Sequence, residues 1–482
     1  MLKIGNMKKN LLLIVCFLFI GINAYTQSGF IGTWEGMISI GGNSLRVVFH
    51  IKNANNGLLS GEMDSPDQGV KGINCSAVTE LGDSLFIEMD KMGAYYAGKM
   101  QDASHIAGVL KQAGYVLPMN LKKGIETAGP NRPQTPKPPF DYISEDVIYQ
   151  NADKTQQFGA TITIPKGWSG ATYPALVLIT GSGLQNRDEE ISGHKPFAVI
   201  ADYLTKKGYI VLRVDDRSMG QSTGDVKNAT TADFAKDVST SFDYLKLRKE
   251  VDTKKMGLLG HSEGGIIAPM LASERKDVDF IILMAGVGEK VIKLMGEQNV
   301  AVLESNGVRK DYVEKYSPLY NEFLQIVMKS EDKADAITKM TQAVDKWKAK
   351  NTADVVIGTT GIQDEQSEQA FVAQFATQAA SAWFKYFLSC DPDVYLRKLS
   401  CKVLAIDGSK DIQVIPGPNL AAIKASLAKS RSKVYEVKEL PELNHLFQTC
   451  AKCTVDEYGE LEETISPLAL QTIGYWLDKN VK

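Results

Sequence analysis

The sequence has little net charge and no long apolar segment. Its formal net charge is −3 over 482 residues, which excludes the strongly basic surface typical of proteins that bind nucleic acids or anionic membranes. The apolar run from Leu11 to Ile22 is shorter than a membrane-spanning helix requires. A small residue, Ala24, follows this run, and three lysines precede it (Lys3, Lys8, Lys9). This pattern predicts a signal peptide over residues 1–24, export to the periplasm or the extracellular space, and no stable membrane insertion after cleavage.

Cysteine is also scarce. Cys16 lies inside the apolar run without the small preceding residue that lipidation favours, so we expect plain export. The five remaining cysteines are an odd number, which leaves at least one thiol unpaired (Cys75, Cys390, Cys401, Cys450, Cys453). Cys450 and Cys453 form a Cys-x-x-Cys motif with no second copy and no histidine pair nearby. We therefore predict a local disulfide there rather than a zinc site, and no metal or organic cofactor.

Residues 28–123 contain short apolar segments with partly alternating polarity. The predicted strands cover residues 45–51, 84–89, 95–100 and 115–117, and turn signals such as Asn55-Asn56-Gly57 separate them. Many short strands joined by glycine-containing turns favour a small all-β domain, either a barrel or a sandwich. Gly32-Thr33-Trp34 resembles the G-x-W opening of lipocalin-like barrels. His50 and His105 are expected to be ordinary strand or loop residues.

Proline recurs between Pro130 and Pro139, which predicts an extended linker over residues 124–140. From residue 141 to residue 482, continuous apolar strands alternate with helices. The predicted strands cover residues 175–179, 209–214, 256–259, 280–284, 402–406 and 434–437, and helices are predicted over 198–204 and 234–247. Apolar strands covered by helices predict an α/β domain with a doubly wound, mostly parallel sheet.

A run of helices interrupts this alternation between about residues 289 and 385. Four segments in it are predicted to be helical (300–303, 320–328, 334–347, 370–387). We interpret the insertion as a cap that walls the active-site pocket and selects the substrate. The alternative is a helical elaboration away from the site.

The stretch Gly260-His261-Ser262-Glu263-Gly264-Gly265 matches the pattern G-x-S-x-G. A short apolar strand precedes it and the apolar start of a helix follows it. A sharp strand-to-helix turn places the serine in a strained conformation and exposes its Oγ, while the glycines allow close packing around it. We therefore predict that Ser262 is a catalytic nucleophile.

A serine hydroxyl needs a base within hydrogen-bond reach, and the chain has five histidines. Two of them belong to the β-domain, His261 lies inside the turn, and His194 precedes it. His445 follows the last predicted strand, and the order serine, acid, histidine is that of α/β-hydrolases. His445 is therefore the predicted base.

The acid of such a triad fixes the tautomer of the histidine and stabilises its protonated form. It is expected in the loop after the strand 402–406, where both Asp407 and Asp411 occur. Asp407 lies at the end of the strand. Asp411 follows a Gly-Ser-Lys turn that can direct its carboxylate toward His445.

An acyl-transfer site also needs hydrogen-bond donors for the developing oxyanion. One predicted donor is the backbone N–H of Glu263, the residue after the nucleophile. The second is expected in the loop Thr180-Gly181-Ser182-Gly183-Leu184, directly after a buried strand. We assign it to the Ser182 N–H, with the Gly183 N–H as the alternative.

Together these motifs resemble bacterial α/β-hydrolase serine carboxylesterases that carry a small β-domain before the hydrolase, with a more distant likeness to prolyl-oligopeptidase-type peptidases. The matching stretches are Gly181 to Asp188, Asp215 to Gly224, Gly260 to Gly265, Gly408 to Val414 and Asn444 to Phe447. The resemblance implies that Asp411, not Asp407, is the acid.

Two positions depart from the pattern of these relatives. Thr180 stands where histidine is usual, and Ser218 replaces a usual glycine. Both changes alter the rim of the pocket, so the resemblance supports the mechanism more strongly than the substrate preference. Asp216 and Arg217 are predicted to form an internal ion pair rather than to take part in catalysis.

The sequence is compatible with three functions. The first is an exported serine hydrolase that cleaves short-chain carboxylic esters through an acyl-enzyme, with a small-molecule ester as its partner. The second is a serine peptidase or aminoacyl hydrolase of prolyl-oligopeptidase type, but residues 28–123 are too short for the propeller of such enzymes. The third is a protein that binds an apolar ligand in its β-domain and carries a vestigial hydrolase, against which the intact serine, acid and histidine argue.

Overall fold

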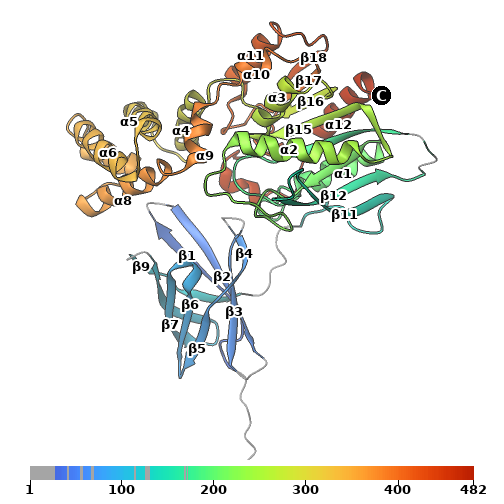
Figure 1. Ribbon diagram of the computed structural model, residues 1–482. Coiled ribbons are helices and arrows are strands. Elements are labelled where there is room, and N and C mark those ends of the chain that lie inside the picture. Colours follow the sequence, from blue (N-terminus) through green and yellow to red (C-terminus); the bar gives the residue numbers. More distant parts are fainter. Residues whose placement is uncertain are drawn as a thin grey trace, which may run out of the picture. The chain divides into compact units, whose positions relative to one another are not determined.

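The structure, a computed structural model, describes residues 28–40, 43–54, 58–66, 70–112, 115–124, 131–167, 170 and 172–482. Three predicted features lie outside the described residues: the signal peptide, the turn Asn55–Gly57, and residues 125–130 of the linker. The chain divides into two compact units, of which the first is formed mainly by residues before 125 and the second contains all residues from 126 onward. Figure 1 shows the first unit in blue and the second in green to red.

The first unit is an antiparallel barrel. Its strands are β1 (Gly32–Ile40), β2 (Asn43–Asn53), β3 (Leu59–Ser65), β4 (Val70–Asn74), β5 (Ala77–Leu81), β6 (Ser84–Met89), β7 (Ala94–Asp102), β8 (His105–Gln112), β9 (Tyr115–Pro118) and β10 (Leu121–Gly124). They follow the order β10-β1-β2-β3-β5-β6-β7-β8-β9, and β10 also pairs with β8. This second pairing closes the sheet, so of the two predicted forms the barrel is confirmed and the sandwich is wrong.

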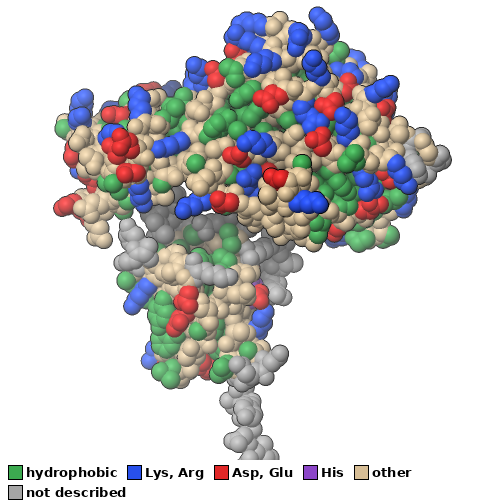
Figure 2. Space-filling view, in the orientation of Figure 1, with side chains coloured by type: hydrophobic (Ala, Val, Ile, Leu, Met, Phe, Trp, Pro, Cys, Tyr) green, Lys and Arg blue, Asp and Glu red, His purple; other side chains and the backbone are tan. Residues whose placement is uncertain are grey.

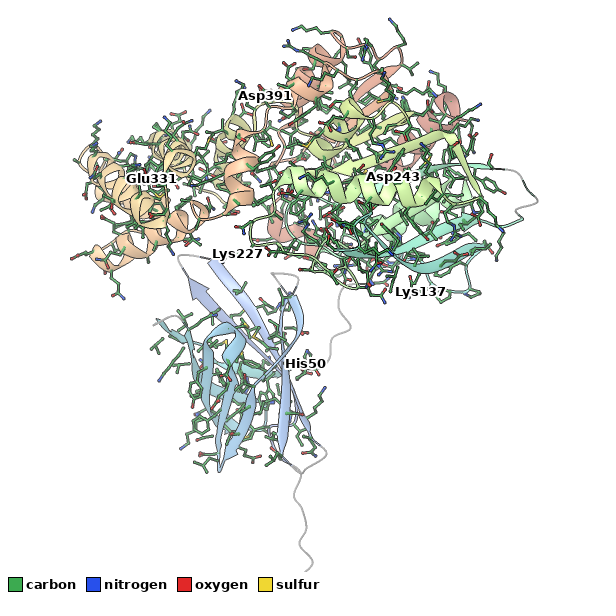
Figure 3. All side chains as sticks on the ribbon, viewed as in Figure 1. His50, Lys137, Lys227, Asp243, Glu331 and Asp391 are labelled. Carbon is green, nitrogen blue, oxygen red and sulfur yellow. A yellow bond between two sulfur atoms is a disulfide. The ribbon has the colours of Figure 1, made fainter. Side chains whose placement is uncertain are left out.

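Large apolar side chains form the core of the barrel. Trp34, Phe49 and Tyr96 are fully buried, and the Trp34 Nε1–H donates to the carbonyl oxygen of Phe30 at 2.7 Å. Burial alternates along β6, as expected when every second side chain faces the interior. His50 lies on β2, where its Nε2 is 2.9 Å from Asp64 Oδ2 (Figure 3).

The second unit is built on an eight-stranded sheet in the order β11-β12-β14-β13-β15-β16-β17-β18. Its elements are β11 (Tyr142–Gln150), β12 (Gln157–Pro165), β13 (Tyr173–Ile179), α1 (Pro196–Lys206), β14 (Ile210–Val214), α2 (Thr231–Lys246), β15 (Val251–His261), α3 (Gly264–Glu274), β16 (Phe280–Met284), β17 (Lys402–Gly408), α11 (Pro416–Leu427), β18 (Tyr435–Leu440) and α12 (Pro467–Asn480). β12 is antiparallel to its neighbours, whereas the pairs from β14 to β18 are parallel.

Helices cover both faces of this sheet. On β13, Val177 packs into one apolar cluster with residues of α2 and α3, whereas Leu176 and Leu178 pack into another cluster with residues of α1 and α12. Strands buried on both sides are therefore apolar throughout, and all five residues of β16 are buried. The predicted doubly wound, mostly parallel sheet is confirmed.

Seven helices lie between β16 and β17. They are α4 (Val291–Ser305), α5 (Lys310–Lys329), α6 (Lys333–Lys348), α7 (Ala353–Thr360), α8 (Glu365–Gln378), α9 (Ala382–Ser389) and α10 (Asp393–Leu396). α5, α6 and α8 group together in Figure 1, and aromatic contacts join them, with the Phe323 ring 5.2 Å from the Phe375 ring. No helix in the described part of the chain is both long enough and apolar enough to cross a membrane.

The described end of the predicted linker is bonded to the second unit. The Arg132 guanidinium donates to the carbonyl oxygens of Ser192 (2.9 Å), Gly459 (2.8 Å) and Leu461. Gln134 donates to the carbonyl oxygen of Ile465 and accepts from the N–H of Thr464. Residues 131–140 therefore fold as part of the second unit, although their proline content predicts a separate spacer.

Candidate active site

Ser262 occupies the turn between β15 and α3. Its φ angle is 53°, in the left-handed region that non-glycine residues rarely adopt. A Cβ at Gly260 would lie 2.0 Å from the Gly264 carbonyl oxygen, and a Cβ at Gly264 would lie 2.4 Å from the Ile179 carbonyl oxygen. The turn therefore needs glycine at both positions, as the G-x-S-x-G pattern predicts.

Asp411 and His445 come from the loops after β17 and β18. His445 Nδ1 is 2.6 Å from Asp411 Oδ2, and both side chains are almost fully buried. Asp411 Oδ1 accepts the backbone N–H groups of Gln413 (2.7 Å) and Val414 (2.9 Å). Burial raises the pKa of Asp411, but the contact with His445, the Val414 N–H and a hydrogen bond from Asp407 outweigh it, so the net pKa is lowered. Asp411 is therefore ionised and fixes the Nδ1–H tautomer of His445.

Asp407 is buried beside Asp411 but does not contact the histidine. Its side chain is fully buried, Oδ1 accepts the N–H of Gly408 at 2.8 Å, and its carboxyl group shares a hydrogen bond with Asp411. Burial and the neighbouring Asp411 charge hold the pKa of Asp407 well above its usual range. Asp407 is therefore a neutral carboxylic acid.

The Ser262 hydroxyl and His445 Nε2 have no hydrogen-bond partner in the described part of the chain. The Ser262 side chain is half-buried. The His445 ring lies 4.8 Å, centroid to centroid, from the ring of His261, which directly precedes Ser262. Bonds between nucleophile and base are often long without substrate and tighten when it binds.

Three backbone N–H groups beside Ser262 donate to no acceptor in the described residues: those of Ser182, Gly183 and Glu263. The Gly181 N–H is not available, because it donates to Glu189 Oε1 at 2.8 Å. A Cβ at Gly181 would lie 3.2 Å from Ser262 Cβ, so this loop passes directly beside the serine. The predicted donors Ser182 and Glu263 are therefore free to bind an oxyanion, and so is the alternative, Gly183.

The side chain of Glu263 connects the turn to the helical insertion. Its Oε1 accepts from Thr231 Oγ1 at 2.7 Å and from Trp383 Nε1 at 2.9 Å, and Trp383 lies on α9. Burial raises the pKa of Glu263, although hydrogen bonds from Thr231, Trp383 and Ser182 oppose that shift. The insertion thus reaches the residue that directly follows Ser262.

The predicted ion pair between Asp216 and Arg217 is wrong. Asp216 accepts the Thr180 hydroxyl at 2.9 Å and the Gln185 N–H at 2.8 Å, and burial raises its pKa to about 7. Arg217 instead pairs with Asp237 of α2, with its Nε 2.7 Å from Oδ2. Adjacent residues at a strand end point in opposite directions, so the two side chains face different partners.

Thr180 and Ser218 mark the two departures from the pattern of the relatives. Through its bond to Asp216, Thr180 fixes the start of the loop that carries Ser182. Ser218 adopts a φ of 62°, the left-handed conformation for which glycine is the usual choice.

Two contacts near the site have no counterpart in the sequence-based predictions. His261 Nδ1 is 3.0 Å from Glu189 Oε1, and His261 Nε2 is 3.0 Å from the His445 carbonyl oxygen. Glu189 lies directly after the matched stretch Gly181 to Asp188, and this position is the only sequence signal that could have drawn attention to it. His194 is buried apart from Ser262, and burial lowers its pKa to about 4.

The predicted disulfide between Cys450 and Cys453 is confirmed, and Cys75, Cys390 and Cys401 are free thiols. Among the described residues, Cys450, Cys453 and Glu457 have the spacing of metal ligands. The two sulfur atoms are bonded to each other, and the Glu457 carboxylate accepts the backbone N–H groups of Ala451, Lys452 and Cys453. These residues are therefore a structural element and do not fit a metal ion.

Comparison with known proteins agrees with this arrangement. Residues 193–359 match the family model described as serine aminopeptidase, S33, a range that includes Ser262 and ends before Asp411. Esterase EstD of Thermotoga maritima is 30% identical over 174 residues, which are 36% of this chain and 41% of the esterase. The chain therefore matches less than half the length of that relative.

Solved structures also resemble the chain at low sequence identity. The Pyrococcus furiosus esterase Pf2001 is 14% identical, with 74% of this chain and 100% of that chain covered and a TM-score of 0.40. Est1E from Butyrivibrio proteoclasticus with bound ferulic acid is 15% identical, with 68% and 96% covered and a TM-score of 0.37. The strand order of the second unit and the match over residues 193–359 agree with each other: the second unit has an α/β-hydrolase fold.

Proposed function

We propose that the protein is an exported serine carboxylesterase that hydrolyses short-chain carboxylic esters through an acyl-enzyme. One observation carries the proposal: the 2.6 Å contact between His445 Nδ1 and Asp411 Oδ2, buried beside a serine in a strained strand-to-helix turn. A buried carboxylate on Nδ1 leaves Nε2 of the histidine as the proton acceptor, which a serine nucleophile requires.

In the proposed reaction, Ser262 Oγ attacks the ester carbonyl carbon while His445 Nε2 takes the hydroxyl proton. The tetrahedral oxyanion accepts the N–H groups of Glu263 and Ser182. His445 then gives its proton to the leaving alcohol, and the acyl group remains on Ser262. Water then attacks the acyl carbon while His445 Nε2 takes one of its protons, and His445 returns that proton to Ser262 Oγ as the carboxylic acid is released. Asp411 stays ionised throughout and stabilises the imidazolium in both halves.

The oxyanion donors account for a large part of the expected rate. Removing one such donor from a serine hydrolase costs about 3–4 kcal/mol of transition-state stabilisation. The Ser182 and Glu263 N–H groups are free for this role, and their loop and turn are fixed by buried carboxyl groups. Preorganised donors of this kind bind the developing charge without rearrangement during the reaction.

The similarity to esterase EstD supports an ester as the substrate. A serine aminopeptidase is the second candidate, because the matching family model carries that description. Prolyl-oligopeptidase-type enzymes place a propeller beside the hydrolase, whereas the first unit here is a barrel of ten short strands. The barrel therefore favours the esterase over that type of peptidase.

The test compares the two substrate classes on the full-length mature protein. Turnover of p-nitrophenyl acetate, butyrate and octanoate is measured beside turnover of aminoacyl p-nitroanilides, with Ser262→Ala as the control. The esterase proposal predicts Ser262-dependent cleavage of the acetate and butyrate that exceeds cleavage of the octanoate and of every anilide. Faster cleavage of an anilide would establish the peptidase instead.

The proposed export rests on the pattern of the first 24 residues, with a cleavage site after Ala24. It is also supported by the disulfide, since disulfides persist in oxidising compartments. Charged residues of both signs are mixed over the face shown in Figure 2, as on an ordinary soluble surface. N-terminal sequencing of the protein from the periplasmic and extracellular fractions tests this, and a mature protein that still begins at Met1 would contradict it.

A further inference from the structure

His261 and Glu189 form a buried pair beside the site. The side chain of His261 is 7% exposed and that of Glu189 is 5% exposed. Glu189 has a φ angle of 51°, a left-handed conformation that is unfavourable for its side-chain type. A buried, strained carboxylate persists only where its contacts stabilise it, so the partners of Glu189 indicate what it does.

Both ring nitrogens of His261 face oxygen atoms. Nε2 lies 3.0 Å from the His445 carbonyl oxygen, which can only accept a hydrogen bond. Nδ1 lies 3.0 Å from Glu189 Oε1, and that same oxygen accepts the Gly181 N–H at 2.8 Å. Accepting the Gly181 N–H favours an unprotonated Oε1, because the hydroxyl oxygen of a carboxylic acid is a weak acceptor. Hydrogen is therefore needed on both nitrogens, and the pair is an imidazolium with a carboxylate.

These contacts form one chain across the site. It begins at the N–H of Gly181, in the loop that carries Ser182, and passes through the Glu189 carboxylate to the His261 ring. It ends at the backbone carbonyl of His445. His261 is directly bonded to Ser262 in the sequence. The chain of contacts thus connects the oxyanion loop, the turn that holds the nucleophile and the loop that holds the base.

We propose that Glu189 and His261 are a pair of positioning residues that holds the oxyanion loop and the His445 loop in their working arrangement around Ser262. This inference rests on the proposed esterase mechanism. Neither side chain touches the reacting atoms. The pair acts by fixing the distance between groups that must converge on one substrate carbonyl, where small displacements reduce rates strongly.

The charges around His261 set a pH dependence. Glu189 faces it from the loop after β13, Asp411 from the loop after β17 and His445 from the loop after β18. Burial lowers the pKa of His261, but the Glu189 and Asp411 charges and the hydrogen bonds outweigh it, so the net pKa is raised. A raised pKa extends the charged state of the ring to higher pH than for an ordinary histidine. As the pH rises through that pKa, the ring loses a proton and with it the contact between His261 and Glu189. This predicts a fall in kcat at alkaline pH.

Two substitutions of His261 each remove one of its two contacts, either the one with Glu189 or the one with the His445 carbonyl. In His261→Gln the amide nitrogen replaces Nε2, so the donor to the His445 carbonyl is kept and the contact with Glu189 is lost. In His261→Asn the amide nitrogen replaces Nδ1, so the opposite end is kept. We expect each variant to lower kcat on p-nitrophenyl acetate between about tenfold and about a hundredfold, with KM changed less than kcat. Neither amide titrates, so the alkaline fall should disappear.

Glu189→Gln removes the charge but keeps an acceptor for Gly181. We expect it to move the alkaline limb of the kcat profile to lower pH by about one unit or more, because the carboxylate no longer favours the imidazolium. Glu250→Gln is the matched control. Glu250 is 9% exposed and pairs with Arg248 at 3.3 Å, apart from the site, so its substitution should leave the profile unchanged.

Nitrogen-15 NMR of the histidine-labelled, full-length protein measures the ring directly and needs no turnover. The inference predicts that both His261 nitrogens carry protons at pH 7 in the wild type, with the signal identified by its movement in Glu189→Gln. A neutral His261 ring, His261 variants with kcat within about twofold of the wild type, or an unmoved limb in Glu189→Gln would each overturn the pairing. If the wild type has no esterase activity, the proposed function fails, and the ring signals still test the pair.

Discussion

Asp407 at the end of β17 and Asp411 in the loop that follows are both fully buried, yet Asp411 is ionised and Asp407 is neutral. Asp411 is ionised because His445 and two backbone N–H groups contact its oxygens. Asp407 has one backbone donor and the charge of Asp411 beside it, so burial keeps it protonated. Two neighbouring buried carboxyl groups rarely both ionise, and the hydrogen-bond donors decide which one does.

Replacing Asp411 with asparagine should lower kcat by up to about 10⁴-fold, because the amide keeps the shape but no longer fixes the tautomer of His445. Asp407→Asn is the matched variant. Since Asp407 is already neutral, its kcat should stay within about tenfold of the wild type. Both values are measured on p-nitrophenyl acetate, with circular dichroism to verify folding. A larger loss in Asp407→Asn would show that Asp407 is the acid of the triad.

Asp407→Asn should also make the protein more stable at neutral pH. A raised pKa means that the folded state binds a proton that the unfolded state releases, so the wild type loses stability as the pH rises above the ordinary pKa of about 3.9 for aspartate. Asparagine has no proton to lose. The gain in Tm from Asp407→Asn should therefore be larger at pH 8 than at pH 5. An equal gain at both pH values would show that Asp407 is not held neutral.

The bond from Trp383 to Glu263 predicts that the insertion contributes to catalysis. Trp383→Phe removes the donor to Oε1 but keeps an aromatic ring against Phe384 and Phe387. A hydrogen bond of this kind contributes about 0.5–1.5 kcal/mol, and leaving a buried partner without it costs about 1–3 kcal/mol. We expect a lower Tm and a kcat reduced about tenfold, because the Glu263 N–H is a proposed oxyanion donor.

Trp347→Phe is the control for that variant. Trp347 also donates a hydrogen bond, to the carbonyl oxygen of Lys315 at 2.8 Å, but it lies within the insertion. It should lower Tm without reducing kcat. If the two variants reduce kcat equally, the contact with Glu263 has no specific role.

The barrel should be dispensable for the hydrolysis of small esters. A chain that begins at residue 126 keeps every element from β11 to α12 as well as Arg132 and Gln134, and should retain kcat on p-nitrophenyl acetate within about twofold. A chain that begins at Asp141 loses the bonds from Arg132 and Gln134 to residues 459–465 and should unfold at a lower temperature. If the longer form folds cooperatively and still loses most of its kcat, the barrel completes the active site.

Much of the fold could be predicted because its signals are local. Strands such as Ala175 to Ile179 are buried on both faces of the sheet, so they consist of consecutive apolar residues, which the sequence shows directly. The choice between barrel and sandwich was not local. It depends on β10 pairing with both β1 and β8, which joins segments far apart in the chain.

The same distinction applies to the site. Ser262 could be proposed from the glycines around it, because a tight turn constrains its neighbours. Glu189 and His261 are 72 residues apart and meet only through the packing of two loops. The predicted Asp216–Arg217 pair failed for a related reason: adjacency in sequence did not imply contact, and Asp237 of α2 was the nearer partner of Arg217.

The most direct test of the account is covalent labelling by a fluorophosphonate, followed by peptide mapping of the full-length protein. We predict one modified residue, Ser262, loss of ester hydrolysis in proportion to the labelling, and no labelling of Ser262→Ala. Modification of a different residue with the same loss of activity, or hydrolysis by Ser262→Ala at the wild-type rate, would contradict it.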